Sequence, residues 1–331
     1  MCKISVIVIS YNEKDYLTRA IESILEQSCN GIQIEIIIGD DGSNDGSIDL
    51  IEQIEKRYSD EQIFISHFVM ERPEFDRPII PSFRVSALIK RALTLVSGDY
   101  CVVLSADDHF CGNTKFKNAI SFLDNNADYF SYVSGFSIVG TEKKEYVPAV
   151  YSSWLFWGHL DYFHVSCFVF RTITPEQLLD RFCDDTGLVY TILKLGKCRG
   201  DKEITFEYMQ RESSIVHSSK ECELLIIEAM IFQDILNDRN PRFGYVFATN
   251  SRDYRFIKQL KQISKDVNDE KFSHYLEDSS KYSNDLIELL VNSRGLVDKT
   301  KCFLFMIKMS FCHYYISVLW RICKLIGVRN G

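Results

Sequence analysis

Two apolar segments in the first third of the chain each end in a pair of aspartates. The runs 34–39 and 100–106 have the composition of buried strands, and they lead into Asp40-Asp41 and Asp107-Asp108. Carboxylates gathered where strands end are costly unless positive charge or hydrogen-bond donors lie among them. Because ligands bind outside the carboxyl ends of the strands in open parallel sheets, we expect the two pairs to form two walls of one site.

Strand-like and helix-like patterns alternate through the first 110 residues. Apolar runs alternate with segments whose apolar residues recur at helical spacing. Strands that are linked by helices of this length pair in parallel, with right-handed crossovers. The chain is therefore predicted to begin with an open α/β sheet. The expected strands are 4–9, 34–38, 63–65 and 100–106, the expected helices are 17–25, 48–58 and 85–96, and a proline-rich loop is expected at 71–81.

The alternation weakens after about residue 111. Aromatic-rich strands are expected at 129–133 and 164–171, and helical patterns dominate from residue 221 onward. We therefore divide the chain into a main domain (1–220), a helical extension (221–298) and a C-terminal tail (299–331).

Composition limits which binding partners and which cellular compartment we expect for the chain. A hydrophobic content of 46% with 25% charged residues is typical of a globular protein. The formal net charge of -8 and the lack of a basic stripe argue against nucleic acid as a partner. The 11 cysteines include no C-x-x-C pair, which favours reduced thiols in a cytoplasmic protein over a disulfide scaffold or zinc site. The first apolar run is too short for a secretory signal, and none is expected.

The tail, residues 299–331, contains no acidic residue and carries six basic ones around an aromatic and aliphatic run. Lys308 and His313 lie inside that run, which makes a membrane span unfavourable. We expect a basic amphipathic segment at the membrane interface. The alternative is a helix that packs on the body of the protein or on a second copy in a homodimer. Interfacial binding predicts a cytoplasmic protein held peripherally on the inner face of the bacterial membrane.

Three ordered motifs carry a family resemblance. They are SVIVISYNE at 5–13, IGDDGSND at 38–45, and the segment 98–108 that ends in SADD. Together they resemble glycosyltransferase family 2, closely over 3–110 and loosely over 163–217. The resemblance implies a GT-A fold, a Rossmann-like mixed sheet flanked by helices, in a catalytic domain at 1–220. It also implies a nucleotide-sugar half at 1–110, an acceptor half at 111–220 and an inverting transfer.

The resemblance implies a set of donor-binding residues. Ser10, Tyr11 and Glu13 would hold the nucleotide, Asp41 would accept from a uracil imide N–H, and Arg84 would meet the base or the pyrophosphate. A ring directly after a strand can cover the face of a base, which supports the role of Tyr11. The alternatives are a capped turn before a helix for the segment around Asp41, and a solvated surface arginine for Arg84.

Asp107-Asp108 resembles the acidic motif with which the family binds a divalent cation, Mn²⁺ or Mg²⁺. Such a cation needs hard oxygen ligands beside the strand end. Ser105 stands where many members have the first acid, so we expect Asp108 to be the direct ligand and Asp107 to contact the ribose or metal-bound water. His109 is expected to be structural. The missing acid leaves open a catalytically impaired member that only binds nucleotide-sugar.

The second half must supply the general base. Residues 182–190 resemble the family's acid-then-helix segment, in which the last acid faces the acceptor, and that acid is Asp185. Asp184, or a helix-capping role for either aspartate, is the alternative. Arg211 lies where the family has a histidine that closes over the pyrophosphate, and His217 is a second candidate for a cationic clamp.

The sequence thus predicts a metal-dependent inverting glycosyltransferase. It would move one sugar from a nucleotide-diphosphate sugar, expected to be a UDP-sugar, to a hydroxyl of a glycan or lipid-linked oligosaccharide, as in bacterial O-antigen or capsule synthesis. The absence of a Gln-x-x-Arg-Trp motif favours one sugar per event over polymer synthesis. A nucleotidyltransferase is the rival reaction, but residues 10–15 lack the glycine- and lysine-rich loop that it requires.

Overall fold

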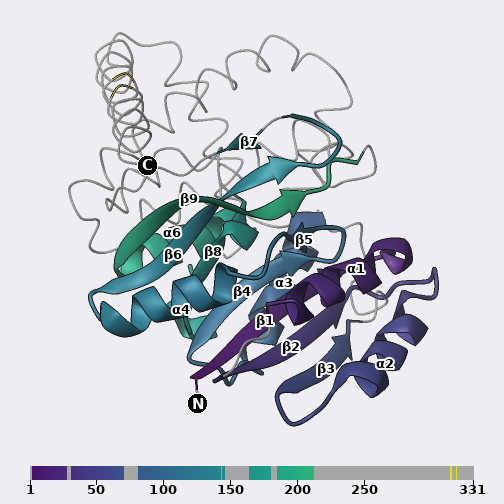
Figure 1. Ribbon diagram of the computed structural model, residues 1–331. Helices are drawn as coiled ribbons and strands as arrows, with labels where there is room; N and C mark the ends of the chain where they lie inside the picture. The colour runs from purple at the N-terminus through teal and green to yellow at the C-terminus, as the bar shows by residue number, and fades with distance from the viewer. Residues whose placement is uncertain are drawn as a thin grey trace, which may run out of the picture.

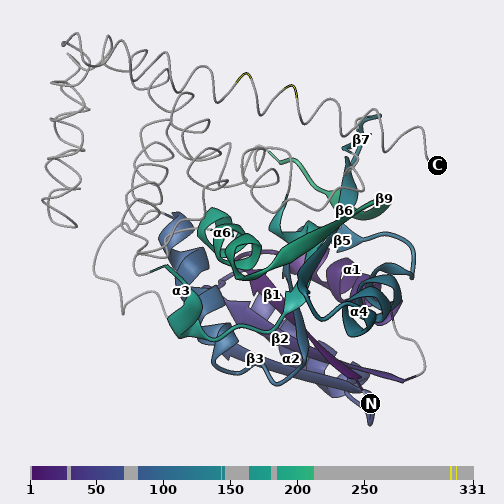
Figure 2. The ribbon, with the colours of Figure 1, turned by 90° about the vertical axis from the view of Figure 1, so that its left-hand side faces the viewer.

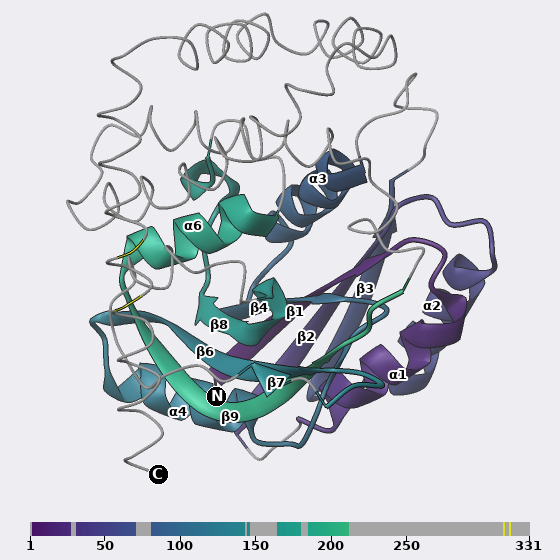
Figure 3. The same ribbon diagram turned by 90° about the horizontal axis from the view of Figure 1, so that it is seen from above.

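The computed structural model describes residues 2–27, 31–70, 81–142, 144–145, 164–179 and 185–211, together with Tyr314 and Val318. These residues build one mixed sheet whose main strand order is β3-β2-β1-β4-β8-β6-β9-β5, with β7 paired to β6 (Figure 1). Helices α1, α2 and α4 cover one face of the sheet, and α3 and α6 cover the other (Figure 3). The architecture is the mixed α/β sheet with flanking helices that the sequence predicts.

The first half of the sheet is parallel, as the alternating pattern predicts. Strand β1 pairs with β2 on one side and with β4 on the other, and β2 pairs with β3. The central position of β1 explains its composition, because residues 4–10 are all buried. The elements are β1 (Cys2–Ser10), α1 (Lys14–Leu25), β2 (Ile32–Asp40), α2 (Ser47–Tyr58), β3 (Ile63–Val69), α3 (Pro81–Leu93) and β4 (Tyr100–Ser105).

Gly98 permits the close approach of the segment before β4 to β1. A Cβ atom built on Gly98 would lie 2.7 Å from the Ser5 hydroxyl oxygen and 2.8 Å from the Ser5 backbone nitrogen. The Gly98 N–H instead donates to that hydroxyl at 2.9 Å. Only glycine fits here without moving β1, so this residue helps to set the position of β4 in the sheet.

The second half of the sheet reverses direction and then returns. Strand β8 is antiparallel to both β4 and β6, whereas β9 runs parallel to β6. The end of β9 then pairs antiparallel with β5, which directly follows Asp108. Residues after β9 are thereby carried back to the carboxyl end of β4. The elements are β5 (His109–Phe110), α4 (Lys115–Asn125), β6 (Tyr129–Ile138), β7 (Lys144–Glu145), the 3-10 turns η3 (Val165–Cys167) and η4 (Pro175–Gln177), β8 (Phe168–Arg171), α6 (Asp185–Leu195) and β9 (Lys197–Tyr208).

Helices α3 and α6 lie side by side on their face of the sheet, although about 90 residues of chain separate them (Figure 2). Helix α6 occupies the segment where the sequence predicts a helix after Asp185. Its residues 187–193 are all buried, so the helix is held from several sides. This packing fixes the position of Asp185, the first residue of α6.

Several predictions fall outside the described residues. They concern the proline-rich loop before α3, Asp184, His217, the helical extension (221–298) and the tail (299–331), of which only Tyr314 and Val318 are described and are helical. Within the described ranges, no helix is long and apolar enough to cross a membrane. The five described cysteines are all free thiols.

Candidate active site

The carboxyl ends of β1, β2 and β4 meet at one edge of the sheet. In the parallel register Ser10 is opposite Asp40, and Ile9 is opposite Ser105. The residues that follow these strands therefore emerge together. Asp41 comes from one side of β1 and Asp107 from the other, which is the arrangement that the paired aspartates predict.

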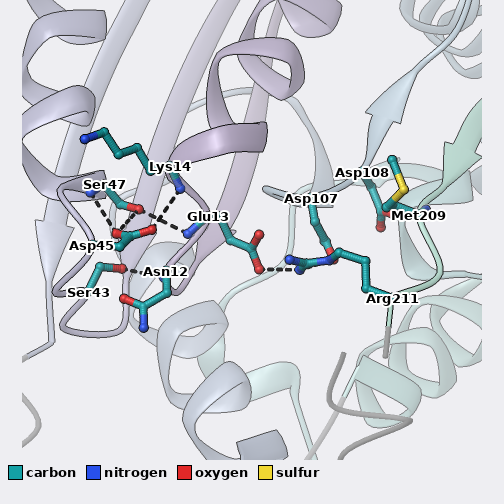
Figure 4. A network of polar contacts seen from close by, with 10 residues as sticks. All are labelled: Asn12, Glu13, Lys14, Ser43, Asp45, Ser47, Asp107, Asp108, Met209 and Arg211. Carbon is teal, nitrogen blue, oxygen red and sulfur yellow. Dashed lines mark hydrogen bonds and ion pairs between the residues drawn. The ribbon is translucent and has the colours of Figure 1, made fainter. Parts of the chain in front are cut away.

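The loops after β1 and β2 are fastened to each other (Figure 4). The Asn12 backbone N–H donates to the Ser43 hydroxyl at 2.8 Å, and the Asn12 side-chain oxygen accepts from the Asn44 N–H at 2.9 Å. The Glu13 N–H donates to the Ser47 hydroxyl at 3.1 Å. Asn12 adopts φ 53°, a left-handed conformation that asparagine tolerates better than most residues. Tyr11 and Glu13 are thus presented from a braced turn.

Ser10 and Tyr11 differ in exposure. The Ser10 side chain is buried, and its hydroxyl has no hydrogen-bond partner among the described residues. Tyr11 is 39% exposed, one of the few large hydrophobic side chains open to solvent in the described part of the chain. An exposed ring at the end of a strand can stack on a planar ligand.

Asp40 and Asp41 have separate roles. Asp40 accepts from the Ser43 N–H at 2.7 Å and from the Ser43 hydroxyl at 2.6 Å, so it is Asp40 that caps the turn. Asp41 pairs with Arg84 of α3, whose Nε donates to Asp41 Oδ2 at 2.6 Å while Nη2 contacts Oδ1. Both side chains are less than 10% exposed. Arg84 is therefore not a solvated surface arginine, and the capped-turn interpretation applies to Asp40.

Arg211 joins the first and last described segments of the site. Its Nη2 donates to Glu13 Oε1 at 2.5 Å and to Asp107 Oδ2 at 2.6 Å, and its Nε donates to the same Asp107 oxygen at 3.1 Å (Figure 4). The guanidinium also lies over the Tyr16 ring, 4.7 Å from its centroid. All three charged side chains are less than 20% exposed. One cation thus bridges two acids that lie 94 positions apart in the sequence, at Glu13 and Asp107.

Burial sets the protonation of this bridge. It raises the pKa of Glu13 from 4.5 to about 7, an effect that Asp107 reinforces and the Arg211 hydrogen bond opposes. Burial alone would lower the pKa of Arg211, but its bonds to Glu13 and Asp107 raise it above the usual value. The arginine is therefore a fixed positive charge, and Glu13 is a carboxyl group that titrates close to neutrality.

Asp108 is almost completely buried, with 1% of its surface exposed. Its Oδ1 accepts from the Met209 backbone N–H at 2.8 Å, whereas Oδ2 has no hydrogen-bond partner among the described residues. Burial, and then the neighbouring Asp107, raise the pKa of Asp108 well above its usual range. His164 Nε2 lies 3.9 Å from Oδ2.

The Asp108 carboxylate can serve as the main protein ligand of a divalent cation. A buried, unsatisfied carboxylate oxygen beside a strand end is a hard donor of the type that Mg²⁺ and Mn²⁺ prefer. The described residues contain no group of three or more His, Cys, Asp or Glu side chains arranged to hold a metal. Mg²⁺ is commonly bound by only one or two carboxylates, and substrate phosphates and water complete its shell.

Asp185 borders the same region from α6. Its charge acts on both His164 and Tyr208, and it raises the pKa of each. Burial lowers the pKa of His164 and raises that of Tyr208. The fields of Asp107 and Asp108 also raise the pKa of Tyr208. Asp185, the predicted base, therefore lies in the same region as Asp107 and Asp108, the predicted metal ligands.

Comparisons with known proteins identify similar sequences and folds. Residues 5–70 match the family described as glycosyl transferase family 2. A UDP-Glc:alpha-D-GlcNAc-diphosphoundecaprenol beta-1,3-glucosyltransferase, WfaP of Escherichia coli, is 31% identical over 150 residues, 45% of this chain and 51% of that protein. The abequosyltransferase RfbV of Salmonella typhimurium is 31% identical over 38% of this chain and 34% of its own length. The chain therefore spans between a third and about half of these curated relatives.

The fold has solved counterparts. The structure of S. aureus TarS 1-349 in complex with UDP-GlcNAc matches with a TM-score of 0.58 and 17% identity, over 77% of this chain and 73% of that one. Over residues 5–70 the chain is similar to glycosyl transferase family 2. Its mixed sheet and flanking helices resemble the GT-A fold of TarS.

His109, next to the acidic motif, has its Nε2 at 2.6 Å from both Glu207 and Arg19. These contacts link β5, β9 and α1, and they agree with the structural role that the sequence analysis favours for His109.

The sequence analysis missed three contributors to the site. They are His164, Tyr208 and the backbone N–H of Met209. A polar residue directly before the apolar run 165–170 was a usable signal for His164. The other two depend on β9, whose mixed polar composition does not identify it as a strand. A backbone donor such as that of Met209 leaves no trace in the residue type.

Proposed function

We propose that this chain is an inverting glycosyltransferase that moves one sugar from a nucleotide-diphosphate sugar to a hydroxyl acceptor. The observation that carries the proposal is the Glu13–Arg211–Asp107 bridge, because it places a fixed cation and two acids where β1, β4 and β9 end. A charged edge of this kind suits a ligand with both phosphates and hydroxyls. The match of residues 5–70 to glycosyl transferase family 2 supports the same reaction class.

The donor nucleotide is proposed to be uridine diphosphate. The paired Asp41 and Arg84 side chains present an acceptor and donors side by side, which complements the N–H and carbonyl groups of a uracil edge. Tyr11 would cover one face of the base. Two relatives support this choice by name, since WfaP uses UDP-Glc and TarS was solved with UDP-GlcNAc.

Arg211 and Asp108 are proposed to manage the leaving diphosphate. Arg211 would donate to a phosphate oxygen, with Glu13 and Asp107 holding its guanidinium in place. Asp108, with Asp107 beside it, would hold a divalent cation, Mn²⁺ or Mg²⁺. When bound, that cation would neutralise the charge that develops on the diphosphate.

Asp185 is the proposed general base. In an inverting transfer the acceptor hydroxyl attacks the anomeric carbon from the face opposite the leaving group while a carboxylate takes its proton. Asp185 starts α6 and is only partly buried, so an acceptor can reach it. The packing of α6 gives it a defined position.

The acceptor is proposed to be a sugar on a lipid diphosphate carrier, at the inner face of the bacterial membrane. WfaP is named for such an acceptor, and RfbV is named for the transfer of abequose. The basic tail (299–331) would bring the chain to that surface. The chain would then act in the synthesis of a surface polysaccharide such as O-antigen or capsule.

The test is transfer by the purified full chain, with a panel of UDP- and GDP-sugars and a lipid-diphosphate-linked acceptor. Wild-type protein should release UDP and form the glycoside, whereas Asp185→Asn should lose turnover and still bind UDP. Asp128→Asn, which changes an exposed acid paired with Lys197, is the matched control and should behave as wild type.

Three results would contradict the proposal. Release of pyrophosphate would identify a nucleotidyltransferase. Tight binding of nucleotide-sugar without turnover would identify an impaired family member. Full activity of Asp185→Asn would remove Asp185 from the role of base.

A further inference from the structure

His164 lies beside the buried carboxylate of Asp108 without touching it. The two nearest atoms, His164 Nε2 and Asp108 Oδ2, are 3.9 Å apart. That distance exceeds a hydrogen bond, for which about 2.7–3.2 Å is usual. Asp108 Oδ2 is nevertheless buried and has no hydrogen-bond partner among the described residues. A buried carboxylate oxygen in this condition requires a partner.

The position of the His164 ring is fixed from two sides. His164 is the N-cap residue of η3, and its side chain accepts from the Ser166 backbone N–H, with 3.3 Å between the nitrogen and Nδ1. The ring stacks on Phe206, with centroids 5.0 Å apart and planes 21° apart. It also lies 5.2 Å from the Tyr208 ring. Phe206 and Tyr208 are alternate residues of β9, so one face of that strand supports the ring.

The capping bond also assigns the proton of the ring. A backbone N–H can only donate, so Nδ1 accepts from the Ser166 N–H at 3.3 Å, and the Ser166 hydroxyl, 2.9 Å from Nδ1, can donate to the same lone pair. In the neutral imidazole the proton is then on Nε2, the atom that faces Asp108. His164 therefore approaches Asp108 as a hydrogen-bond donor. An Nε2 that carries a proton has no lone pair left with which to bind a metal.

The distance between His164 Nε2 and Asp108 Oδ2 is the one that a single bridging water would span. Two hydrogen bonds of about 2.8 Å that meet at a right angle join atoms about 4 Å apart. A water at that point would accept from His164 Nε2 and donate to Asp108 Oδ2. With Met209 already bound to Oδ1, both oxygens of the carboxylate would be held, each with a lone pair to spare.

We propose that His164 is a positioning residue that orients Asp108 through one bridging water, so that the carboxylate is preset for a divalent cation. The inference rests on the proposed function for the identity of the cation site. Residues that orient metal ligands in this way typically change metal affinity by about 10- to 100-fold when they are replaced.

Two substitutions separate positioning from a purely structural role. His164→Asn keeps an acceptor that can cap η3, because asparagine is a favoured N-cap residue, but its side chain is too short to reach the water. His164→Gln places an amide N–H near the position of Nε2. His67→Asn is the matched control, because His67 of β3 pairs with Glu55 of α2.

The measurement is Mn²⁺ affinity of the full chain, by electron paramagnetic resonance with and without UDP, together with kcat, KM and the melting temperature. We expect His164→Asn to weaken Mn²⁺ binding by about 10-fold or more, to lower kcat more than it raises the donor KM, and to leave the melting temperature near wild type. His164→Gln should recover much of the affinity, and His67→Asn should not change it.

Wild-type Mn²⁺ affinity in His164→Asn would overturn the inference, and so would a wild-type chain that binds no divalent cation. The proposed function fails separately, if the wild-type chain transfers no sugar from any nucleotide donor. Mn²⁺ binding remains measurable in that case, so the two failures are distinguishable.

Discussion

Replacing Glu13 with glutamine is expected to stabilise the protein at and above neutral pH. Burial raises the pKa of Glu13 from 4.5 to about 7 in the folded chain. The folded state therefore holds a proton between these values that the unfolded state has released, and stability falls as pH rises through this window. A shift of this size corresponds to about 3 kcal/mol of unfolding free energy, lost between roughly pH 4 and pH 8.

This loss of unfolding free energy already allows for the stabilisation that Arg211 gives to the ionised form of Glu13. Its hydrogen bond lowers the pKa of Glu13, but burial and Asp107 outweigh it. Glutamine does not ionise, so it avoids the penalty and can still accept from Arg211. The Glu13→Gln variant should match wild type within about 1 kcal/mol near pH 4.5 and exceed its stability by up to about 3 kcal/mol at pH 8.

The assay is urea denaturation of both proteins at several pH values between 4.5 and 8.5, followed by circular dichroism. Asp15→Asn is the matched control, because Asp15 is exposed in the same first turn of α1. A stability difference between Glu13→Gln and wild type that stays constant with pH would refute the reasoning. A stability advantage of Glu13→Gln that shrinks as pH rises would mean that folding lowers the pKa of Glu13 instead of raising it.

Three further outcomes are expected. Arg211→Ala should lower kcat/KM by roughly 100-fold, because it removes a preorganised cation from the diphosphate, and Arg211→Lys should restore part of it; equal activity in all three proteins would contradict this role. Asp41→Ala should destabilise the fold by about 3–5 kcal/mol in urea titrations, since it removes the buried carboxylate that pairs with the Arg84 guanidinium, and a loss under 1 kcal/mol would contradict the buried pair. Burial lowers the pKa of Lys115 from 10.5 to about 8, so stability should rise between these pH values and Lys115→Met should abolish the rise, as a comparison of melting temperatures at pH 7.5 and 10 would show.

The parallel half of the fold was predictable because each element carries its own local signal. Strand β1 is apolar throughout, and the aspartates after β2 and β4 follow from the rule that ligands bind at the carboxyl ends of strands. Helix α4 also carried a signal that the sequence analysis missed, since Phe116, Ala119, Ile120 and Leu123 recur at helical spacing and are all buried. Its buried Lys115, which bonds to Ser134, Thr205 and a backbone carbonyl, interrupts that pattern.

The polar contacts of the site were harder to predict from the sequence. The family resemblance places both Glu13 and Arg211 at the donor, but their direct contact was not predictable, because 198 positions separate them and the contact depends on the path of β9. The distinction between Asp40 and Asp41 likewise depends on which carboxylate faces the turn and which faces α3. Side-chain direction at a strand end is set by tertiary packing, and residue type alone does not specify it.

The return of β9 to β5 has a consequence for synthesis of the chain. Asp107 leaves the ribosome 104 residues before Arg211, a delay of roughly 5 to 20 seconds at ordinary translation rates. Throughout that interval the parallel strands can assemble, but their acids lack the only described side chain that bridges them. Glu13 and Asp107 therefore lack their shared guanidinium until the last strand docks, and a chain truncated before β9 would leave both carboxylates without it.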